Sequence, residues 1–539
     1  MIFIFVHITV DKLICNMFNK IKYYILFIII PIVIFGYNNI KSNDHYKKLK
    51  TFTEVLRLVN DNYYEDVDMD KIIDGAIVGM LDELDPHSSY IPSESLKNIN
   101  EQFSGKFEGI GIEFDILDDF ITVISPIPGT PSDKAGLQSG DKLIKINDTS
   151  AYKITFDEVF KKLRGPKGSK VKLSIKRNSL DEPLDITLIR DEIPIFSVLA
   201  SFLLDNETGY IKINRFASTT TQEFQDAIDI LINKGMKQLI IDLRNNGGGL
   251  MDEAIDMVDL FISSNEKILI TKGKILGSDH VYYATKKAPY KDLPVITIIN
   301  RGSASASEIV SGAFQDLDRG IVIGETSFGK GLVQRQFPLY SDGSAARITI
   351  ARYYTPSGRL IQRDYDETYE NYYSNLIQEN REATDSTLKE RPKFKTLSGR
   401  TVYGGGGIMP DFHIETKLDL SESSLNIFSH PDRIIFNFAS LLNNEVSELH
   451  NNYNDFYNDF SIKNDNLNKF INLLKEKNIS YIEEELNSDW NYIENRIKAE
   501  IASSIWGKQF LFKTYIKEDV QVQSAFDYFE DASKLIQVN

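Results

Sequence analysis

The sequence predicts a multidomain protein of the α/β and α+β classes, with an α/β core, a smaller strand-rich domain before it and helical segments at both ends. Its 539 residues suffice for two to four domains with separate cores. Hydrophobic residues make up 42% and charged residues 26%, as in ordinary globular proteins. Strands, glycine turns and helices alternate in the middle of the chain, whereas helical periodicity dominates its ends.

Charge and cysteine content exclude several classes of function. The net charge of −16 argues against a broad nucleic-acid-binding surface, because phosphate binding needs an excess of basic residues. Cys15 is the only cysteine, which excludes a disulfide or a cysteine-ligated metal site within one chain. We therefore expect no nucleic-acid partner.

Residues 1–44 are expected to form a cytoplasmic stub followed by a signal anchor or signal peptide. Residues 23–37 are an uncharged, apolar run of 15 residues that follows Lys20 and Lys22. A basic flank before an apolar core is typical of a signal sequence. No clear small-residue cleavage motif follows, which favours an anchor that is retained. A buried core helix is the alternative, and it fits the terminal position and the basic flank less well.

Residues 45–105 are predicted to form a small helical domain. Apolar side chains recur at helical spacing in two stretches, at residues 52–59 and 72–81. The sequence Leu-Asp-Pro-His-Ser-Ser-Tyr at 84–90 follows the second stretch, and Pro86 ends the helix there because proline cannot continue a helical hydrogen-bond ladder.

Residues 106–190 change to strands and glycine turns. The stretch 109–114 (Gly-Ile-Gly-Ile-Glu-Phe) and the turn 135–141 resemble the carboxylate-binding loop and the middle turn of a PDZ domain. Small glycines let consecutive backbone N–H groups converge on a terminal carboxylate, and the next strand edge pairs with the peptide. The resemblance implies a tail-binding site at Gly109, Ile110, Gly111 and Ile112. A tight turn in a small barrel is the alternative.

Residues 191–416 are predicted to be the α/β core. A capping box at 220–223 opens a helix, and a buried strand at 237–243 ends in a glycine turn. A strand at 293–300, a helix at 306–317 and a strand at 320–324 follow. Residues 363–395 are polar and are expected to be a surface insertion or a long loop. The helical extension 417–539 carries no chemical motif, and packing, dimerisation and partner binding all stay open for it.

A serine between a strand and a helix is the first candidate for chemistry. Ser305 directly precedes the predicted helix, so its hydroxyl lies at a helix N-terminus, where Ala306 has an unpaired N–H. An oxyanion would be stabilised there, and the turn with Gly247 and Gly248 could supply a second donor. Helix capping is the ordinary role of serines in such a position.

Lys330, which lies between two glycines, is the candidate base. The flanking histidines, His280 and His413, lie in no triad motif, so a nucleophilic Ser305 needs a base other than imidazole. Burial can lower the pKa of a lysine from about 10.4 by several units. Gln334 can hold the amine without the negative charge that would raise its pKa. An isolated lysine is more often solvated, so the assignment depends on the joint pattern.

A nucleotide-binding loop is the rival interpretation of residues 324–331. Their sequence, Gly-Glu-Thr-Ser-Phe-Gly-Lys-Gly, nearly matches the phosphate-binding pattern G-x-x-x-x-G-K-[ST]. Gly331, however, replaces the serine or threonine that would hold magnesium, and residues 332–338 do not resemble the helix that the motif requires. The sequence therefore disfavours nucleotide binding.

Together these motifs resemble the carboxyl-terminal processing proteases, also called tail-specific proteases. The likeness covers residues 45–416 and is carried by residues 242–248, 303–309, 324–331, 354–359 and 404–411. It implies a serine endopeptidase with Ser305 as the nucleophile, Lys330 as the general base and Gln334 as the residue that orients the lysine. The oxyanion donors would be the backbone N–H groups of Ala306 and of Gly247 or Gly248.

The resemblance also implies supporting residues and partners. Glu308 and Asp316 fall on positions that the family tends to keep acidic, and Arg164 matches a family arginine near the PDZ gate. The PDZ domain would bind the C-terminal tails of protein substrates, and no metal or organic cofactor is implied. An activating partner or adaptor and a homo-oligomer stay open.

We expect this protein in the bacterial cell envelope, anchored in the inner membrane with its catalytic part in the periplasm, or exported. The competing class of function is a catalytically silent PDZ scaffold that recruits protein tails to another protease. Such a scaffold would keep residues 109–114 but would need neither Lys330 nor Gln334, so their presence favours the enzyme.

Overall fold

The computed structural model describes residues 44–263, 265–285, 287–365, 369–378, 388–389, 391–416 and 419–538. It divides into two compact units, residues 1–80 and 81–539. In the first unit it describes α2 (Asp44–Asn62) and the start of α3 (Met69–Asp82). The run at 23–37, predicted to be an anchor, lies outside the described residues. None of the helices within them has the length and apolar character needed to cross a bilayer.

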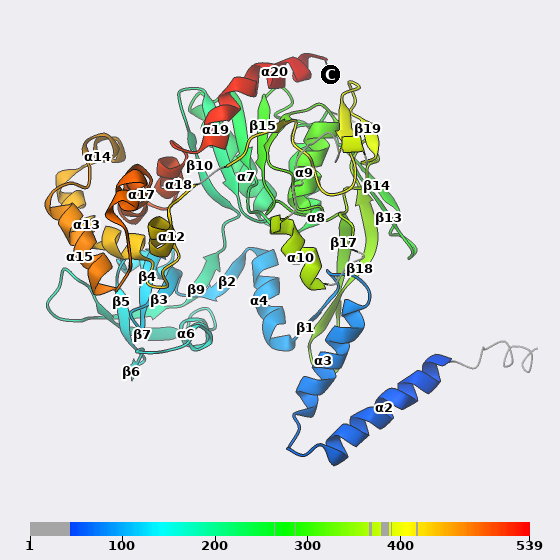
Figure 1. Cartoon of the computed structure of the whole chain (residues 1–539), viewed down its shortest axis with the longest axis horizontal. Helices are drawn as coiled ribbons and strands as arrows, with labels where there is room; N and C mark the ends of the chain where they lie inside the picture. The colour runs from blue at the N-terminus through cyan, green and yellow to red at the C-terminus, as the bar shows by residue number, and fades with distance from the viewer. Residues whose placement is uncertain are drawn as a thin grey trace, which may run out of the picture. The chain divides into compact units, whose positions relative to one another are not determined.

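A six-stranded antiparallel sheet forms the domain predicted at 106–190 (Figure 1). Its strand order is β3-β4-β5-β7-β8, with β6 paired to β5, so β3 is an edge strand. Strands β2 and β9 precede and follow this sheet in the chain and pair antiparallel with each other, which brings both ends of the domain together. The elements of this region are α4 (Ser93–Ser104), β2 (Lys106–Gly109), β3 (Ile112–Leu117), β4 (Phe120–Pro126), α5 (Pro131–Lys134), β5 (Lys142–Ile146), β6 (Thr149–Ser150), α6 (Phe156–Leu163), β7 (Lys170–Lys176), β8 (Leu184–Ile189) and β9 (Asp191–Pro194).

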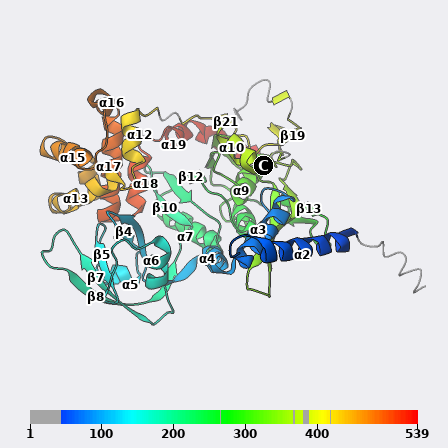
Figure 2. The same cartoon turned by 60° about the horizontal axis from the view of Figure 1, so that its bottom comes forward.

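The core is built on a second six-stranded sheet, in the order β10-β11-β12-β15-β16-β21. Figure 2 labels three of its strands, β10, β12 and β21. Strand β10 runs antiparallel to β11 and every later pair is parallel, as the α/β prediction requires. Helices α7, α8 and α9 cover one face through a single apolar cluster. The elements are β10 (Val198–Leu203), β11 (Thr208–Ile213), α7 (Thr220–Asn233), β12 (Gln238–Asp242), α8 (Met251–Asp259), β15 (Val295–Ile299), α9 (Ala306–Asp316), β16 (Ile321–Gly324) and β21 (Phe412–His413).

The C-terminal extension covers the opposite face of this sheet. Val522 and Phe529 share an apolar cluster with sheet residues such as Ile240. Earlier helices of the extension form a core of their own, and Lys508 forms an ion pair with Glu113 of strand β3. The extension is therefore part of both domains' packing. Its helices are α12 (Glu422–Phe428), α13 (Ile434–Leu449), α14 (Tyr453–Asp459), α15 (Asp465–Glu476), α16 (Glu483–Ser488), α17 (Trp490–Trp506), α18 (Gln509–Tyr515), α19 (Val520–Ala525) and α20 (Phe529–Val538), with a 3-10 turn η1 (Phe526–Tyr528).

The segment that follows Gly324 leads into a strand of a smaller antiparallel sheet. Its order is β1-β18-β13-β14, and β17 pairs with β18. Residues 324–331 lead into the strand β17, whereas a nucleotide-binding loop must lead into a helix, so that alternative is excluded. The strands are β1 (Ser89–Ile91), β13 (Lys267–Gly273), β14 (His280–Tyr283), β17 (Leu332–Pro338) and β18 (Ala345–Tyr354).

The predicted capping box at 220–223 is wrong. Thr219 is the N-cap residue of α7, one position earlier than expected. The Glu223 carboxylate instead accepts the backbone N–H groups of Ser197 and Val198, at 2.8 and 3.0 Å. The carboxylate therefore fixes the chain that enters the core sheet, a tertiary contact that local spacing cannot reveal.

The polar segment 363–395 holds more structure than its composition suggests. It contains α10 (Tyr369–Gln378) and β19 (Lys393–Lys395), which pairs with β20 (Thr401–Tyr403). Arg363 and Tyr372 are buried, and the guanidinium of the arginine lies 4.0 Å from the centre of the tyrosine ring. Stacking of this kind lets polar residue types become part of a core.

Candidate active site

Ser305 lies where the fully buried strand β15 passes through a short turn into helix α9. Its φ angle is 54°, a left-handed conformation that non-glycine residues rarely adopt and that is held here by the surrounding contacts. The neighbouring Ser303 and Ser307 hydroxyls donate to backbone carbonyls at 2.8 and 2.9 Å. The Ser305 side chain forms a capping box with Glu308, and its hydroxyl proton has no acceptor among the described residues. The side chain lines a cavity of about 470 Å³. Of the three serines, only Ser305 has its hydroxyl free to react.

A glycine turn follows strand β12 and lies against Ser305. A Cβ atom on Gly248 would lie 2.7 Å from the Ala304 carbonyl oxygen, so no side chain fits there. The Gly248 N–H donates to the Asn246 side chain at 2.9 Å. The N–H groups of Gly247 and Ala306, in contrast, have no acceptor among the described residues. Of the predicted oxyanion donors, the N–H groups of Gly247 and Ala306 are therefore available to a substrate, whereas that of Gly248 already donates to Asn246.

Lys330 lines the same cavity, on the loop between β16 and β17. Its Nζ donates to the Oε1 atom of Gln334, the third residue of strand β17, at 2.7 Å. Burial and, to a smaller extent, the nearby positive charge of Arg347 lower the pKa of Lys330 to about 8. A substantial fraction of the amine is therefore neutral near physiological pH, as a base requires.

Glu308 joins the serine segment to the lysine segment. Its buried carboxylate accepts hydrogen bonds from the Ser305 N–H at 2.8 Å and the Lys330 N–H at 2.9 Å. The Gly329 N–H and the Ser327 hydroxyl donate to it as well, each at 2.6 Å. Burial raises the pKa of Glu308, while the four donors favour its charged form. One side chain thus fixes both backbones that present the dyad.

Replacing Glu308 with alanine is expected to impair folding and activity together. Four donors would lose their acceptor in a buried site, and losing a buried charged partner typically costs about 3–5 kcal/mol. Thermal unfolding and kcat/KM of the variant measure the two effects. Glu308→Gln keeps the shape and one strong acceptor, so it should fall between parent and alanine variant. An alanine variant with parental Tm and parental kcat/KM would contradict this role.

Asp316 is not part of the cavity. It lies at the opposite end of α9 from Ser305, where its carboxylate forms a fully buried ion pair with Arg359 at 2.7 Å. It also accepts the Ser357 N–H at 3.0 Å. This ion pair ties the helix to the segment 354–359, so Asp316 supports the fold around the site and does not contact reacting groups.

The predicted tail-binding residues run from the end of strand β2 to the start of strand β3. Gly111 has a φ angle of 82°, and a Cβ atom there would lie 2.3 Å from the Thr130 side chain, so glycine is required. Ile110 and Ile112 are buried in the core of the domain. The rings of Phe114 on β3 and Phe160 on α6 lie 5.5 Å apart in an edge contact. The edge of β3 and the aromatic residues form an apolar surface next to the loop.

Gly109 and Arg164 lie beside that surface. Gly109 is the last residue of β2. A Cβ atom added there would contact the ring of Phe107 and lie near the backbone of Arg164. The Arg164 guanidinium forms an ion pair with Glu101 of α4 at 2.6 Å and lies over the Phe160 ring. Arg164 therefore links the domain at 106–190 to α4, and it does not line the cavity that holds Ser305.

Sequence reasoning missed a histidine close to the lysine. His87 is distant from Lys330 in sequence, but its backbone carbonyl accepts a hydrogen bond from Gln334 Nε2–H. Its imidazole is close enough to Lys330 for the lysine charge to shift the imidazole pKa. Burial and the charge of Lys330 lower the pKa of His87 to about 4, so the ring is neutral at ordinary pH. The only sequence signal was the helix-ending Leu-Asp-Pro-His-Ser-Ser-Tyr motif at 84–90.

Four family models match the chain. Peptidase family S41 matches residues 207–369, which include Ser305, Lys330 and Gln334, and a PDZ domain matches residues 122–177. A model described as the activating protease CtpB N-terminal domain matches residues 35–95. A family of unknown function matches residues 432–507, within the C-terminal extension.

Curated relatives match more than half of this chain. A carboxy-terminal-processing protease of Bartonella bacilliformis is 38% identical over 355 residues, which are 64% of this chain and 81% of the relative. The carboxy-terminal processing protease CtpA of Bacillus subtilis is 38% identical over 331 residues, 61% of this chain and 70% of the relative. Among solved structures, a photosystem II D1 C-terminal processing protease is 25% identical, covers 68% of this chain and 87% of its own, and superposes with a TM-score of 0.34.

Proposed function

Because the chain belongs to the carboxy-terminal processing proteases of peptidase family S41 and is a serine peptidase, we propose that Ser305 is its nucleophile and Lys330 its general base. One observation carries the proposal: a free serine hydroxyl and a buried lysine of lowered pKa line one cavity. Glu308 holds the backbones of both. No hydrogen bond joins the Ser305 hydroxyl to the lysine in this structure, so substrate binding would bring the two into contact.

In the first half of the reaction the neutral Lys330 amine takes the proton of the Ser305 hydroxyl. With a pKa of about 8, roughly a tenth of the lysine is neutral at pH 7. The serine oxygen attacks the carbonyl carbon of the scissile peptide bond, and the lysine ammonium returns the proton to the leaving amine. The product is an ester between Ser305 and the substrate, with the new N-terminus released.

In the second half water resolves the ester. Lys330 takes a proton from water, the hydroxide attacks the ester carbonyl, and the proton passes to the Ser305 oxygen as the carboxylate leaves. The oxyanion of both tetrahedral states would be held by the N–H groups of Ala306, at the N-terminus of α9, and of Gly247. The engaged Gly248 N–H would serve only if its bond to Asn246 opened.

Substrate tails would bind at the PDZ domain. The free edge of β3 can pair with an extended peptide, and the loop at Gly109, Ile110, Gly111 and Ile112 can hold its terminal carboxylate. Phe114 and Phe160 offer an apolar surface to the tail's side chains. A location in the bacterial cell envelope, with an inner-membrane anchor, is supported by the basic-flanked apolar run at 23–37.

The test uses an unstructured reporter that ends in an apolar tail, prepared with a free carboxylate and with an amidated C-terminus. The full-length chain should cleave both, and the amidated reporter should show a KM raised about tenfold or more with little change in kcat, because a charged hydrogen-bond partner is lost. Equal KM values would contradict tail recognition by the carboxylate. If neither reporter is cleaved, the proposed function itself is contradicted.

A further inference from the structure

Residues 85–88 form a tight turn, here called the His87 turn, that precedes strand β1. The Asp85 side chain is 8% exposed, and its Oδ1 accepts the His87 and Ser88 N–H groups at 2.9 and 2.8 Å. Its Oδ2 accepts the Ser88 hydroxyl at 2.8 Å. The Ser88 oxygen in turn accepts the Thr349 N–H of β18 at 3.2 Å. One carboxylate therefore sets the shape of the turn, and β18 fixes its position.

The His87 turn determines which end of the Gln334 amide faces Lys330. The His87 backbone carbonyl can only accept, so the NH₂ group of Gln334 must point toward it. The carbonyl end, Oε1, is then the atom that accepts from Lys330 Nζ. A reversed amide would point its NH₂ group at the amine and could donate to the lone pair that the base needs. Fixing the amide keeps that lone pair available.

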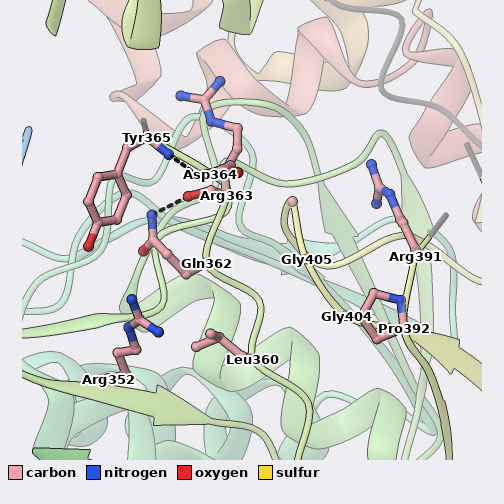
Figure 3. Close-up of a pocket in the computed structure, with 11 residues that line it drawn as sticks. Arg352, Leu360, Gln362, Arg363, Asp364, Tyr365, Arg391, Pro392, Gly404 and Gly405 are labelled. Atoms are coloured by element: carbon pink, nitrogen blue, oxygen red, sulfur yellow. Dashed lines mark hydrogen bonds between the residues drawn. The ribbon is translucent and has the colours of Figure 1, made fainter. Parts of the chain in front are cut away.

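A second chain of contacts joins the His87 turn to the backbone beside the lysine. The His87 ring nitrogen Nε2 and the Tyr372 hydroxyl lie 3.1 Å apart, and Tyr372 accepts from the Gln362 side chain at 3.4 Å. Gln362 Oε1 accepts the Gly331 N–H at 2.8 Å. Figure 3 shows Gln362 beside Arg363, whose backbone carbonyl accepts from the same Gln362 amide at 2.8 Å. The lysine segment is thus held from two sides.

We propose that the His87 turn is a positioning element for the general base: Asp85 shapes the turn, and the His87 carbonyl orients the Gln334 amide so that it accepts from Lys330. This inference rests on the proposed function and assigns a role to the Asp-Pro-His-Ser sequence of this chain. Asp85 and His87 contact no reacting group, so they position Lys330 mainly through Gln334, and the negative charge of Asp85 also raises the pKa of Lys330.

Asp85→Ala is the direct test, with kcat and KM measured on the tail-bearing reporter. The lysine acts in the chemical steps, so kcat should fall about tenfold to a hundredfold, as for the loss of one hydrogen bond to a charged group, while KM stays within about twofold. Asp85→Asn keeps an oxygen for both backbone N–H groups and should restore kcat to within about threefold of the parent. A raised KM with an unchanged kcat would overturn the proposal.

Asp205 provides a matched control. In the turn between β10 and β11 its carboxylate accepts the Glu207 and Thr208 N–H groups at 2.8 and 2.6 Å and the Thr208 hydroxyl at 3.0 Å, the same pattern as at Asp85. Asp205→Ala removes an equivalent set of bonds away from the cavity and should leave kcat unchanged. If it lowers kcat as much as Asp85→Ala does, the effect of Asp85 is a general loss of stability, and the positioning role is wrong.

Combining Asp85→Ala with Gln334→Ala separates positioning from other effects. If the turn acts through Gln334, the double variant should be no slower than Gln334→Ala alone. Additive losses would contradict the proposal, even with a normal Tm. Failure of the proposed function would be distinguishable, because then the parent would not cleave the reporter or Ser305→Ala would still cleave it.

Discussion

Replacing Ser305 with alanine is expected to abolish cleavage of an unstructured reporter while the protein stays folded. No described residue accepts from the Ser305 hydroxyl, and the Glu308 N–H of the capping box also donates to the Ser305 carbonyl at 2.9 Å, so removal of the hydroxyl leaves no buried group without a partner. Loss of a serine nucleophile typically lowers kcat by more than about ten-thousandfold. The measurement is kcat on the tail-bearing reporter, with Tm and tail binding followed in parallel. Both should match the parent.

Ser307→Ala is the matched control for this prediction. Ser307 is two residues away, in the first turn of α9, and is buried, but its hydroxyl donates to the Asn246 carbonyl at 2.9 Å. Its loss should lower stability by about 1 kcal/mol and leave most of the activity. If Ser307→Ala is inactive and Ser305→Ala retains activity, the assignment of the nucleophile is wrong.

Replacing Lys330 with methionine should be nearly as damaging. Methionine fills a similar volume but cannot accept a proton, and general acid–base groups contribute about a hundredfold to ten-thousandfold in rate. Lys330→Arg keeps the positive charge but not a usable base, because guanidinium stays protonated, so it should be inactive as well. An active arginine variant would show that charge alone, and not proton transfer, is what Lys330 supplies.

The pH dependence of the parent provides an independent check on the lysine. A general base acts when it is deprotonated, so kcat/KM should rise as pH rises through about 8, the pKa of Lys330. Arg347 pushes that pKa down, whereas Glu308 and Asp85 push it up, and His87 is neutral in this range. Arg347→Gln should therefore move the acidic limb toward higher pH. A limb that does not move would mean that another group titrates.

Much of the site could be predicted from the sequence because its parts are local. Ser305 and Ala306 lie at a strand-to-helix junction, and Lys330 and Gln334 are four residues apart, so spacing and residue type were informative. The alternation of strands and helices likewise predicted the core sheet. The glycine turn at 247–249 could be predicted from the sequence. That position 248 admits only glycine follows from its contact with Ala304, which the sequence does not reveal.

What the sequence could not predict depends on contacts between distant segments. The role of Glu308 follows from four donors, three of them on the loop 327–330. His87 meets Gln334 across 247 positions of sequence, which no local pattern encodes. The predicted capping box at 220–223 is wrong for the same reason: the Glu223 carboxylate accepts from the backbone N–H groups of Ser197 and Val198, which are distant in sequence.

The most direct test of the central claim is to label the full-length protein with a serine-reactive fluorophosphonate and to locate the adduct by peptide mass spectrometry. If Ser305 and Lys330 form the dyad, one adduct forms, on Ser305; it forms faster as pH rises through about 8 and is strongly slowed in Lys330→Met. An adduct on another serine, or labelling of Ser305 at the same rate with and without Lys330, would contradict a Ser305–Lys330 dyad.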